Sequence, residues 1–214
     1  QQVKSITQLQ KRLDMFGLAS QFFKTFDLTG TTWNPSDKNS AVTLLSGNLT
    51  AVGTVTKSGT VRATVGKTTG SFYQEIVVVS PAASTANHCA GVTNGSMVLT
   101  ANVGSIASSI GFITNGSLIR GNANIASGIL GVLVAGDIIS IATNINLGRV
   151  FFRKNGGAWV NSGNPVAGTG GHTFTPSGTI YPAVCCSGSL QLWTARFAAT
   201  SWGYAAPSGY LEWV

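Results

Sequence analysis

Basic and aromatic side chains are grouped most densely in the stretch GRVFFRKNGGAWVNSG, residues 148–163 of this 214-residue chain. The stretch holds two arginines, one lysine, two phenylalanines and one tryptophan. Positive charge beside aromatic rings is the composition of surfaces that bind nucleic acid, and also of surfaces that contact sugars or proteins. The stretch therefore raises three functional hypotheses, with a purely structural hairpin as the fourth interpretation.

Strand alternation separates these side chains. Val150, Phe152 and Lys154 fall on one face of the predicted strand, with Phe151 and Arg153 on the other. The Asn-Gly pair at 155–156 predicts a type I′ turn, so the charges flank the tip of a hairpin. We interpret the stretch first as a structural hairpin. The candidate contacts with a ligand or partner are the residues near its tip and the histidine that ends a glycine-rich loop: Arg153, Lys154, Trp159 and His172.

Catalytic groups are scarce. The six carboxylates are Asp14, Asp27, Asp37, Glu75, Asp137 and Glu212, and no local sequence marks two of them as a glycosidase pair. The two histidines are isolated, and neither a G-x-S-x-G nor an H-E-x-x-H motif occurs. The glycine-rich AGTGGH, residues 167–172, lacks the lysine and the following helix of a phosphate-binding loop. We predict no enzymatic activity, no cofactor and no metal site, while a triad assembled from distant residues stays open.

The three cysteines, Cys89, Cys185 and Cys186, lack the paired C-x-x-C spacing of zinc ribbons. Neighbouring Cys185 and Cys186 on a strand point to opposite faces, so at most one of them can easily meet Cys89. The sequence favours small buried apolar residues here. It leaves open whether Cys89 pairs with Cys185 or Cys186.

Charge and hydropathy exclude two classes of partner. The net charge of +7 comes from thirteen Lys and Arg against six Asp and Glu, and the basic residues are scattered without a run of five. Scattered charge gives weak, salt-sensitive attraction to polyanions, so we predict no specific nucleic-acid binding. The longest apolar stretch, IASGILGVLVAGDIISIA, is interrupted by three glycines and an aspartate, which predicts no membrane span.

Residues 1–30 differ from the rest of the chain. In SITQLQKRLDMFGLASQFFKTF, residues 5–26, apolar residues recur at spacings of three, four and three, which predicts a short amphipathic helix. This segment either packs on its own domain or acts as an anchor or oligomerisation helix that buries its stripe in a partner. The predicted anchor residues are Ile6, Leu9, Leu13, Phe16, Phe22 and Phe23.

Residues 31–214 have the pattern of a mainly β domain. Short apolar or alternating runs, such as SFYQEIVVV, DIISIAT and RVFFRKN, recur between clusters of Gly, Asn, Ser and Pro. No helix of useful length separates these runs, which argues against a parallel α/β sheet. Short strands with turn signals at this spacing predict an antiparallel sandwich or barrel.

Several of these segments together resemble one family. DIISIATNINLGRVFFRKNGGAW, TIYPAVCCSG and LWTARFAATSWGY resemble, in this order, the late strands of SPRY (B30.2-like) domains. TWNPSDKNSAVTLLSGNLTAVG and VRATVGKTTGSFYQEIVV are similar to the opening strands of SPRY-like modules in bacteriophage virion proteins. Residues 82–128 depart from the family pattern, and ATNINLGR lacks the acidic residues of the family's turn. The resemblance implies a bent sandwich of two antiparallel sheets, with recognition by loops at one end and binding rather than catalysis.

The expected protein is thus a short N-terminal amphipathic helix followed by a SPRY-like antiparallel β-sandwich. The expected function is that of a non-enzymatic bacteriophage virion protein in a tail fibre, baseplate or head fibre. It would bind host-surface glycan or protein through loops of the domain. The alternative is a structural decoration or cement protein of the capsid or tail with no receptor role. Expected partners are other virion proteins and, in a homo-oligomer, further copies of the chain.

Overall fold

A computed structural model describes residues 30–53, 58–80, 88–187 and 192–214, and residues 31–214 belong to one unit. The predicted N-terminal helix lies outside the described residues, together with its anchor residues Ile6, Leu9, Leu13, Phe16, Phe22 and Phe23. The helix, its role and the division at residue 30 therefore stay predictions. Within the described ranges, no helix has the length and hydrophobicity needed to cross a membrane.

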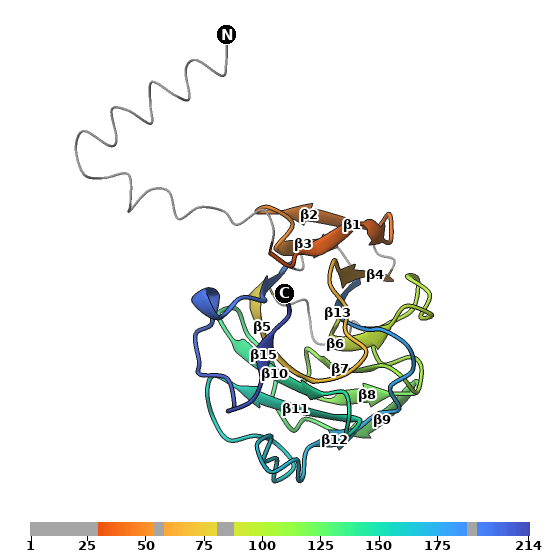
Figure 1. The fold of residues 1–214 in the computed structure, drawn as a ribbon. Helices are drawn as coiled ribbons and strands as arrows, with labels where there is room; N and C mark the ends of the chain where they lie inside the picture. Colours follow the sequence, from red (N-terminus) through yellow and green to blue (C-terminus); the bar gives the residue numbers. More distant parts are fainter. Residues whose placement is uncertain (1–29, 54–57, 81–87, 188–191) are drawn as a thin grey trace, which may run out of the picture. The chain divides into compact units, whose positions relative to one another are not determined.

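The first of two sheets has the spatial order β1-β4-β13-β6-β7-β8-β9 (Figure 1). Neighbouring strands in it are antiparallel throughout. Strands distant in sequence therefore lie next to one another at its centre. The seven strands are β1 (Trp33–Lys38), β4 (Ser58–Ala63), β13 (Ile180–Ser187), β6 (Cys89–Asn94), β7 (Ile110–Ile113), β8 (Leu118–Arg120) and β9 (Ala123–Ala126).

The second sheet has the order β12-β11-β10-β5-β14-β3-β2, again with antiparallel neighbours. One further strand, β15 (Leu211–Glu212), runs parallel to the start of β5. It pairs with the first residues of β5, whereas β14 pairs with the later ones. The other strands are β2 (Val42–Leu45), β3 (Thr50–Gly53), β5 (Ser71–Ser80), β10 (Ile138–Asn144), β11 (Arg149–Lys154), β12 (His172–Thr173) and β14 (Leu192–Arg196). The 3₁₀ turn η1 (Ala199–Ser201) follows β14.

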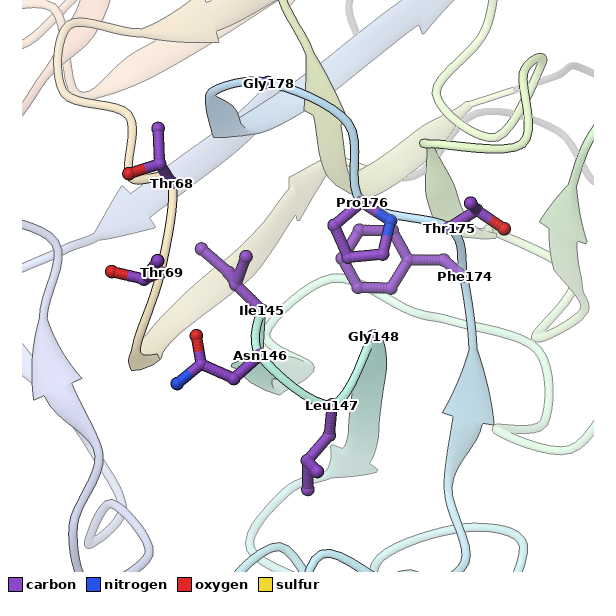
Figure 2. A pocket seen from close by; sticks show the side chains of 10 residues that line it. All are labelled: Thr68, Thr69, Ile145, Asn146, Leu147, Gly148, Phe174, Thr175, Pro176 and Gly178. Carbon is purple, nitrogen blue, oxygen red and sulfur yellow. The ribbon is translucent and has the colours of Figure 1, made fainter.

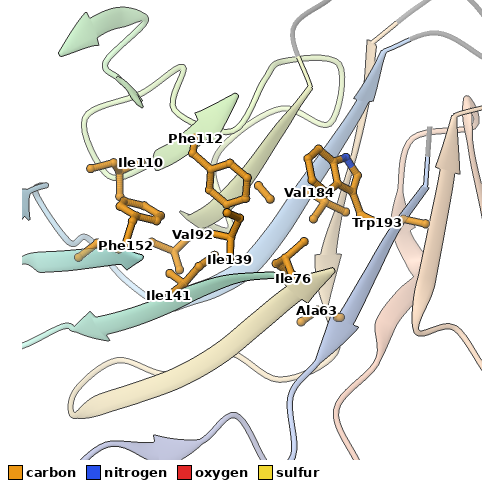
Figure 3. Close-up of a cluster of buried hydrophobic side chains, with 14 of the residues drawn as sticks. Ala63, Ile76, Val92, Ile110, Phe112, Ile139, Ile141, Phe152, Val184 and Trp193 are labelled. Carbon is orange, nitrogen blue, oxygen red and sulfur yellow. The ribbon is translucent and has the colours of Figure 1, made fainter. Parts of the chain in front are cut away.

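The main core lies between the two sheets. Val92 and Phe112 from the first sheet face Ile76, Ile141 and Phe152 from the second (Figure 3). The Phe112 ring meets the Phe152 ring edge-on, with 5.9 Å between their centres, so aromatic contacts join the sheets. Each of these side chains is fully buried, which contributes about 1.5–3 kcal/mol apiece. The mainly β antiparallel sandwich predicted from the sequence is confirmed.

Strand β11 shows the predicted alternation. Phe152 is buried in the main core, whereas Phe151 belongs to a separate cluster on the outer face of the second sheet. Asn155 and Gly156 have φ values of 51° and 68°, and the Gly157 N–H donates to the Lys154 carbonyl at 2.9 Å. Positive φ at both central positions defines the predicted type I′ turn, which is confirmed.

The C-terminal strand closes one edge of the core. Trp213 is fully buried, and its ring centre lies 4.8 Å from that of Phe72 on β5. The Thr31 hydroxyl donates to the Trp213 carbonyl, so the start and the end of the domain are hydrogen-bonded to each other. The Lys67 ammonium donates a hydrogen bond to the carbonyl oxygen of Val214, the residue after Trp213.

All three cysteines are buried and none of them is in a disulfide bond, as the sequence favoured. Cys186 belongs to the main core, whereas Cys185 and Cys89 belong to an apolar cluster on the other face of the first sheet. The prediction that Cys185 and Cys186 point to opposite faces is confirmed. Cys89 therefore faces Cys185 and not Cys186.

Candidate functional site

Arg153, the first candidate contact, lies on the outer face of the second sheet. Its guanidinium carbon is 4.4 Å from the centre of the Trp159 ring and 6.0 Å from that of Tyr204. Its Nη2 donates to the Ala205 carbonyl at 2.6 Å and more weakly to the Tyr73 hydroxyl at 3.4 Å. Arg153 and Trp159 are both half-buried. The arginine thus holds the segment after β14, at Tyr204 and Ala205, against the outer face of the sheet.

A buried carboxylate holds the same segment from below. Glu75 is fully buried, and its Oε2 accepts the Gly203 N–H at 2.7 Å. Its Oε1 accepts the Tyr204 N–H and the Tyr73 hydroxyl, both at 2.8 Å. Arg196 Nη1 lies 3.3 Å from Oε2. Burial and the neighbouring Glu75 raise the pKa of Tyr73 to about 12, so its hydroxyl stays a donor at neutral pH.

Lys154, the second candidate, forms an ion pair at the hairpin tip. Its Nζ lies 2.8 Å from Asp137 Oδ2 and donates to the Val132 carbonyl at 3.1 Å. Asn155 donates its side-chain N–H to Asp137 Oδ1 at 2.8 Å. Burial would raise the pKa of Asp137, but hydrogen bonds from Lys154, Val134 N–H and Asn155 outweigh it and lower the pKa. The lysine therefore joins the tip of the hairpin to the loop that precedes β10.

His172 lies at the opposite end of β11 from these groups. It pairs with Val150 on β11, whereas Arg153 and Lys154 lie toward the turn. Burial, and next the charge of Arg120, lower the pKa of His172, which favours a neutral imidazole at pH 7. Its Nε2 is buried without a hydrogen-bond partner among the described residues. The four predicted contacts are thus divided between two places, and as ligand contacts they stay predictions.

A groove of about 520 Å³ lies at this second end of the sandwich, where three loops meet (Figure 2). The loops join β4 to β5, β10 to β11, and β12 to β13. No sequence motif indicates this groove. Its lining residues are Thr68, Thr69, Ile145, Asn146, Leu147, Gly148, Phe174, Thr175, Pro176 and Gly178.

The groove offers hydroxyl, amide and apolar surface without a charged lining residue. Thr68, Asn146 and Thr175 are exposed, and Leu147 is 54% exposed. Phe174 is buried beneath them. Such a lining suits an uncharged ligand that carries both hydrogen-bonding groups and apolar faces.

Backbone and side-chain bonds hold the groove loops in place. Asn146 Oδ1 accepts the Gly70 N–H at 3.1 Å, which joins two of the loops. The Phe174 N–H donates to the Gly148 carbonyl at 2.9 Å, which joins the third. Gly148 has a φ of 59°, and a Cβ there would lie 2.7 Å from the Phe174 carbonyl oxygen. Only glycine allows this approach, so Gly148 permits the close contact between two of the groove loops.

The carboxylates of the β domain that could catalyse are held in ion pairs. Arg62 donates two hydrogen bonds of 2.7 Å to the Asp37 carboxylate, one from Nε and one from Nη2. Glu75 and Asp137 have the partners described above. In the ranges that the structure describes, no three potential metal ligands of the His, Cys, Asp and Glu types lie close together.

Comparison with known proteins yields matches in structure alone. No protein-family model matches the sequence, and no curated protein matches it significantly. The SPRY domain of human HERC1 superposes with a TM-score of 0.62 at 16% identity, covering 76% of this chain and 96% of that one. The TRIM65 PSpry domain gives 0.56 at 15% identity, over 78% of this chain and 92% of that one. The fold is SPRY-like.

Stonustoxin matches with a TM-score of 0.55 and 20% identity over 78% of this chain and 27% of its own. The resemblance to SPRY domains predicted from the sequence is confirmed at the level of fold. In this SPRY-like sandwich, the groove occupies loops at one end, on the side away from the β11 turn.

Proposed function

We propose that the chain is a non-enzymatic binding protein whose SPRY-like domain takes up an uncharged ligand in the groove at its loop end. The observation that carries this proposal is the uncharged, partly polar lining of the groove. Its volume of about 520 Å³ lies within the ~300–1,000 Å³ of typical ligand sites. Threonine hydroxyls and the Asn146 amide would meet sugar hydroxyls or peptide groups, and Leu147 would meet an apolar face.

Binding without catalysis agrees with the state of the carboxylates. Each of the three carboxylates forms an ion pair within the fold: Asp37 with Arg62, Asp137 with Lys154, and Glu75 with Arg196. A catalytic acid or base must reach the substrate, but Glu75 and Asp137 are buried, and the partly exposed Asp37 is held by two bonds from Arg62. The lining of the groove contains neither a histidine nor a carboxylate.

The setting we propose is a bacteriophage virion, in a tail fibre, baseplate or head fibre, with host-surface glycan or protein as ligand. Supporting it is the similarity of the opening strands to SPRY-like modules of virion proteins. The uncharged polar composition, with only 9% charged residues against a typical ~25%, agrees with an extracellular particle surface.

The test is binding of the full chain to host cells and to their envelope polysaccharide, with a charge placed in the groove. Thr68→Lys and Thr175→Lys change exposed lining residues, and Thr43→Lys on β2 is the control, since Thr43 is also exposed. We expect the groove variants to weaken binding at least ten-fold and the control to bind as the wild type does. Equal binding by all three folded variants would exclude the groove, and no binding by the wild type would remove the receptor role.

A structural decoration or cement protein is the second candidate, and one surface favours it. In the loop before β10, Val132 and Val134 are 60% and 55% exposed, and Ile129 is 37% exposed. Exposed aliphatic side chains so close in sequence suit a protein contact inside a particle. Val132→Asp with Val134→Asp should then lower particle stability without changing adsorption to cells.

A further inference from the structure

Two of the three cysteines face each other across neighbouring strands. Cys89 on β6 is the direct register partner of Cys185 on β13. Directly opposed residues of an antiparallel pair have Cα atoms about 4.5–5.5 Å apart, which lies inside the range of about 4.4–6.8 Å seen across disulfides. Both side chains project to the same face of the first sheet, into the cluster formed with Met97, Val103 and Ala183.

One hydrogen bond already joins the two thiols. Cys89 donates to the Cys185 sulfur, and Cys185 donates to Asn102 Oδ1 at 3.1 Å. The bond to Cys89 and one from Thr60 lower the pKa of Cys185, although burial opposes this. The same bond to Cys185, together with burial, raises the pKa of Cys89. The pair therefore contains one thiol disposed to act as the attacking thiolate and one disposed to stay protonated.

Cys186 cannot take part in this pair. It is the next residue on β13, and its side chain is fully buried in the main core on the opposite face of the sheet. Its register partner is Gly59 on β4, which offers no thiol. The geometry thus selects one pair out of the three that are possible in sequence.

We propose that Cys89 and Cys185 form a reversible cross-strand disulfide when the protein meets an oxidising thiol–disulfide environment. With a small-molecule disulfide as oxidant, the Cys185 thiolate attacks one sulfur and expels one thiolate. The Cys89 thiolate then attacks the mixed disulfide at Cys185 and expels the second. Two protein thiols lose two electrons and two protons, and the oxidant is reduced to two thiols. The product would tie β6 to β13 at the centre of the first sheet.

Access to the sulfurs depends on the segment that covers them. Thr60 N–H donates to the Leu99 carbonyl at 2.9 Å, and its hydroxyl donates to the Ala101 carbonyl at 2.6 Å. These bonds hold the segment containing Asn102 over Cys185. Both cysteines are fully buried beneath it, so the oxidant must enter during opening of this segment or during folding.

The experiment is refolding of the full chain from urea in mixtures of reduced and oxidised glutathione, which removes the barrier of burial. Remaining thiols are blocked with N-ethylmaleimide under denaturing conditions and counted by mass spectrometry. We expect one blocked thiol in the wild type, none in Cys186→Ala, and two in each of Cys89→Ala and Cys185→Ala. Peptide mapping of the wild type should identify the Cys89–Cys185 link directly, even if one of the variants does not fold.

The folded product supplies a second readout. Oxidised wild type should melt about 5–15 °C higher than the same sample reduced with dithiothreitol, because the link closes a long loop. Cys185→Ala, with the same treatment, should show no shift. Three blocked thiols at every glutathione ratio, or a link that includes Cys186, would overturn the proposal.

Discussion

The guanidinium of Arg153 is stacked on the ring of Trp159, 4.4 Å from its centre, near the tip of the hairpin that begins with β11. A cation in this position contributes about 0.5–1 kcal/mol at an exposed site and more where water is excluded. The most conspicuous charge of the stretch therefore stabilises the chain's own fold. Its second contact, with the Ala205 carbonyl, extends the same role to the segment after β14.

A double-mutant cycle should detect this contact. Arg153→Met keeps most of the packing volume and removes the charge, while Trp159→Leu removes the ring. We expect each to lower the free energy of unfolding by about 1–2 kcal/mol, with a coupling of about 0.5–1 kcal/mol between them. Urea denaturation measures both. Strictly additive losses would show that the stacking contributes nothing beyond separate packing.

Replacement of the buried carboxylate should release the segment that it holds. Glu75→Gln places an amide N–H against backbone donors of Gly203 or Tyr204 and leaves Arg196 without its counter-charge. We expect a loss of about 2–4 kcal/mol in unfolding free energy. Trp202, whose ring centre lies 4.7 Å from that of Tyr73, should report the release by altered fluorescence. Glu212→Gln, on β15, is the control, with an expected change of at most about 0.5 kcal/mol.

Gly91 on β6 should tolerate no side chain. A Cβ at this position would lie 2.1 Å from the Ile110 carbonyl oxygen and 2.7 Å from Gly111 Cα on the neighbouring strand. Backbone atoms cannot yield without separating β6 from β7, so Gly91→Ala should cost more than about 3 kcal/mol or prevent folding. At Gly95 the nearest atom would be a Tyr181 ring carbon at 3.9 Å, and Gly95→Ala should fold normally. Thermal melting of the two variants compares them directly, and similar melting temperatures would contradict the close approach.

Acid should begin to destabilise the fold at a pH above the range in which carboxylates titrate. Burial lowers the pKa of His88 from its usual 6.5 to about 4, so the folded protein keeps it neutral where the unfolded chain is protonated. The unfolding free energy should therefore fall as pH drops from 6.5 to 4, by about 2–3 kcal/mol. Above pH 6.5 this group adds no pH dependence. The lowered pKa of His172 acts in the same direction.

The variant His88→Gln separates the contribution of His88 to the pH dependence from that of His172. The variant lacks the titrating imidazole, so its stability should vary less between pH 6.5 and 4 than that of the wild type. Urea denaturation at several pH values measures the two slopes. Identical slopes would show that His88 is accessible to protons in the folded state.

The strands and the hairpin turn were predictable because their signals are local. In β11 the alternation of Phe151 and Phe152 reports two faces, and Asn155 with Gly156 reports the positive φ values of the turn. Pairing of β4 with β13, or of β5 with β14, brings together segments more than a hundred residues apart. Such pairing leaves no periodic trace in either segment, so only the family resemblance pointed to it.

The candidate site was less predictable for the same reason. Arg153 and Lys154 were conspicuous by their charge, but their partners Ala205 and Asp137 are not adjacent in sequence. The groove unites three loops that are separated along the chain and lined by threonine, asparagine and glycine. These residue types occur in ordinary turns, so their composition carries no signal until the fold brings the loops together.

The hydrogen bond from the Thr31 hydroxyl to the Trp213 carbonyl places the two ends of the domain next to each other. Since the two ends of the domain meet, a short Gly-Ser bridge can join them, and the cut can be moved elsewhere. Val166 and Ala167 lie in an exposed loop between β11 and β12, which suits new termini. A circular permutant that starts at Ala167 should keep the native sheets. By the same geometry, the domain can be inserted as a cassette into a surface loop of a host protein.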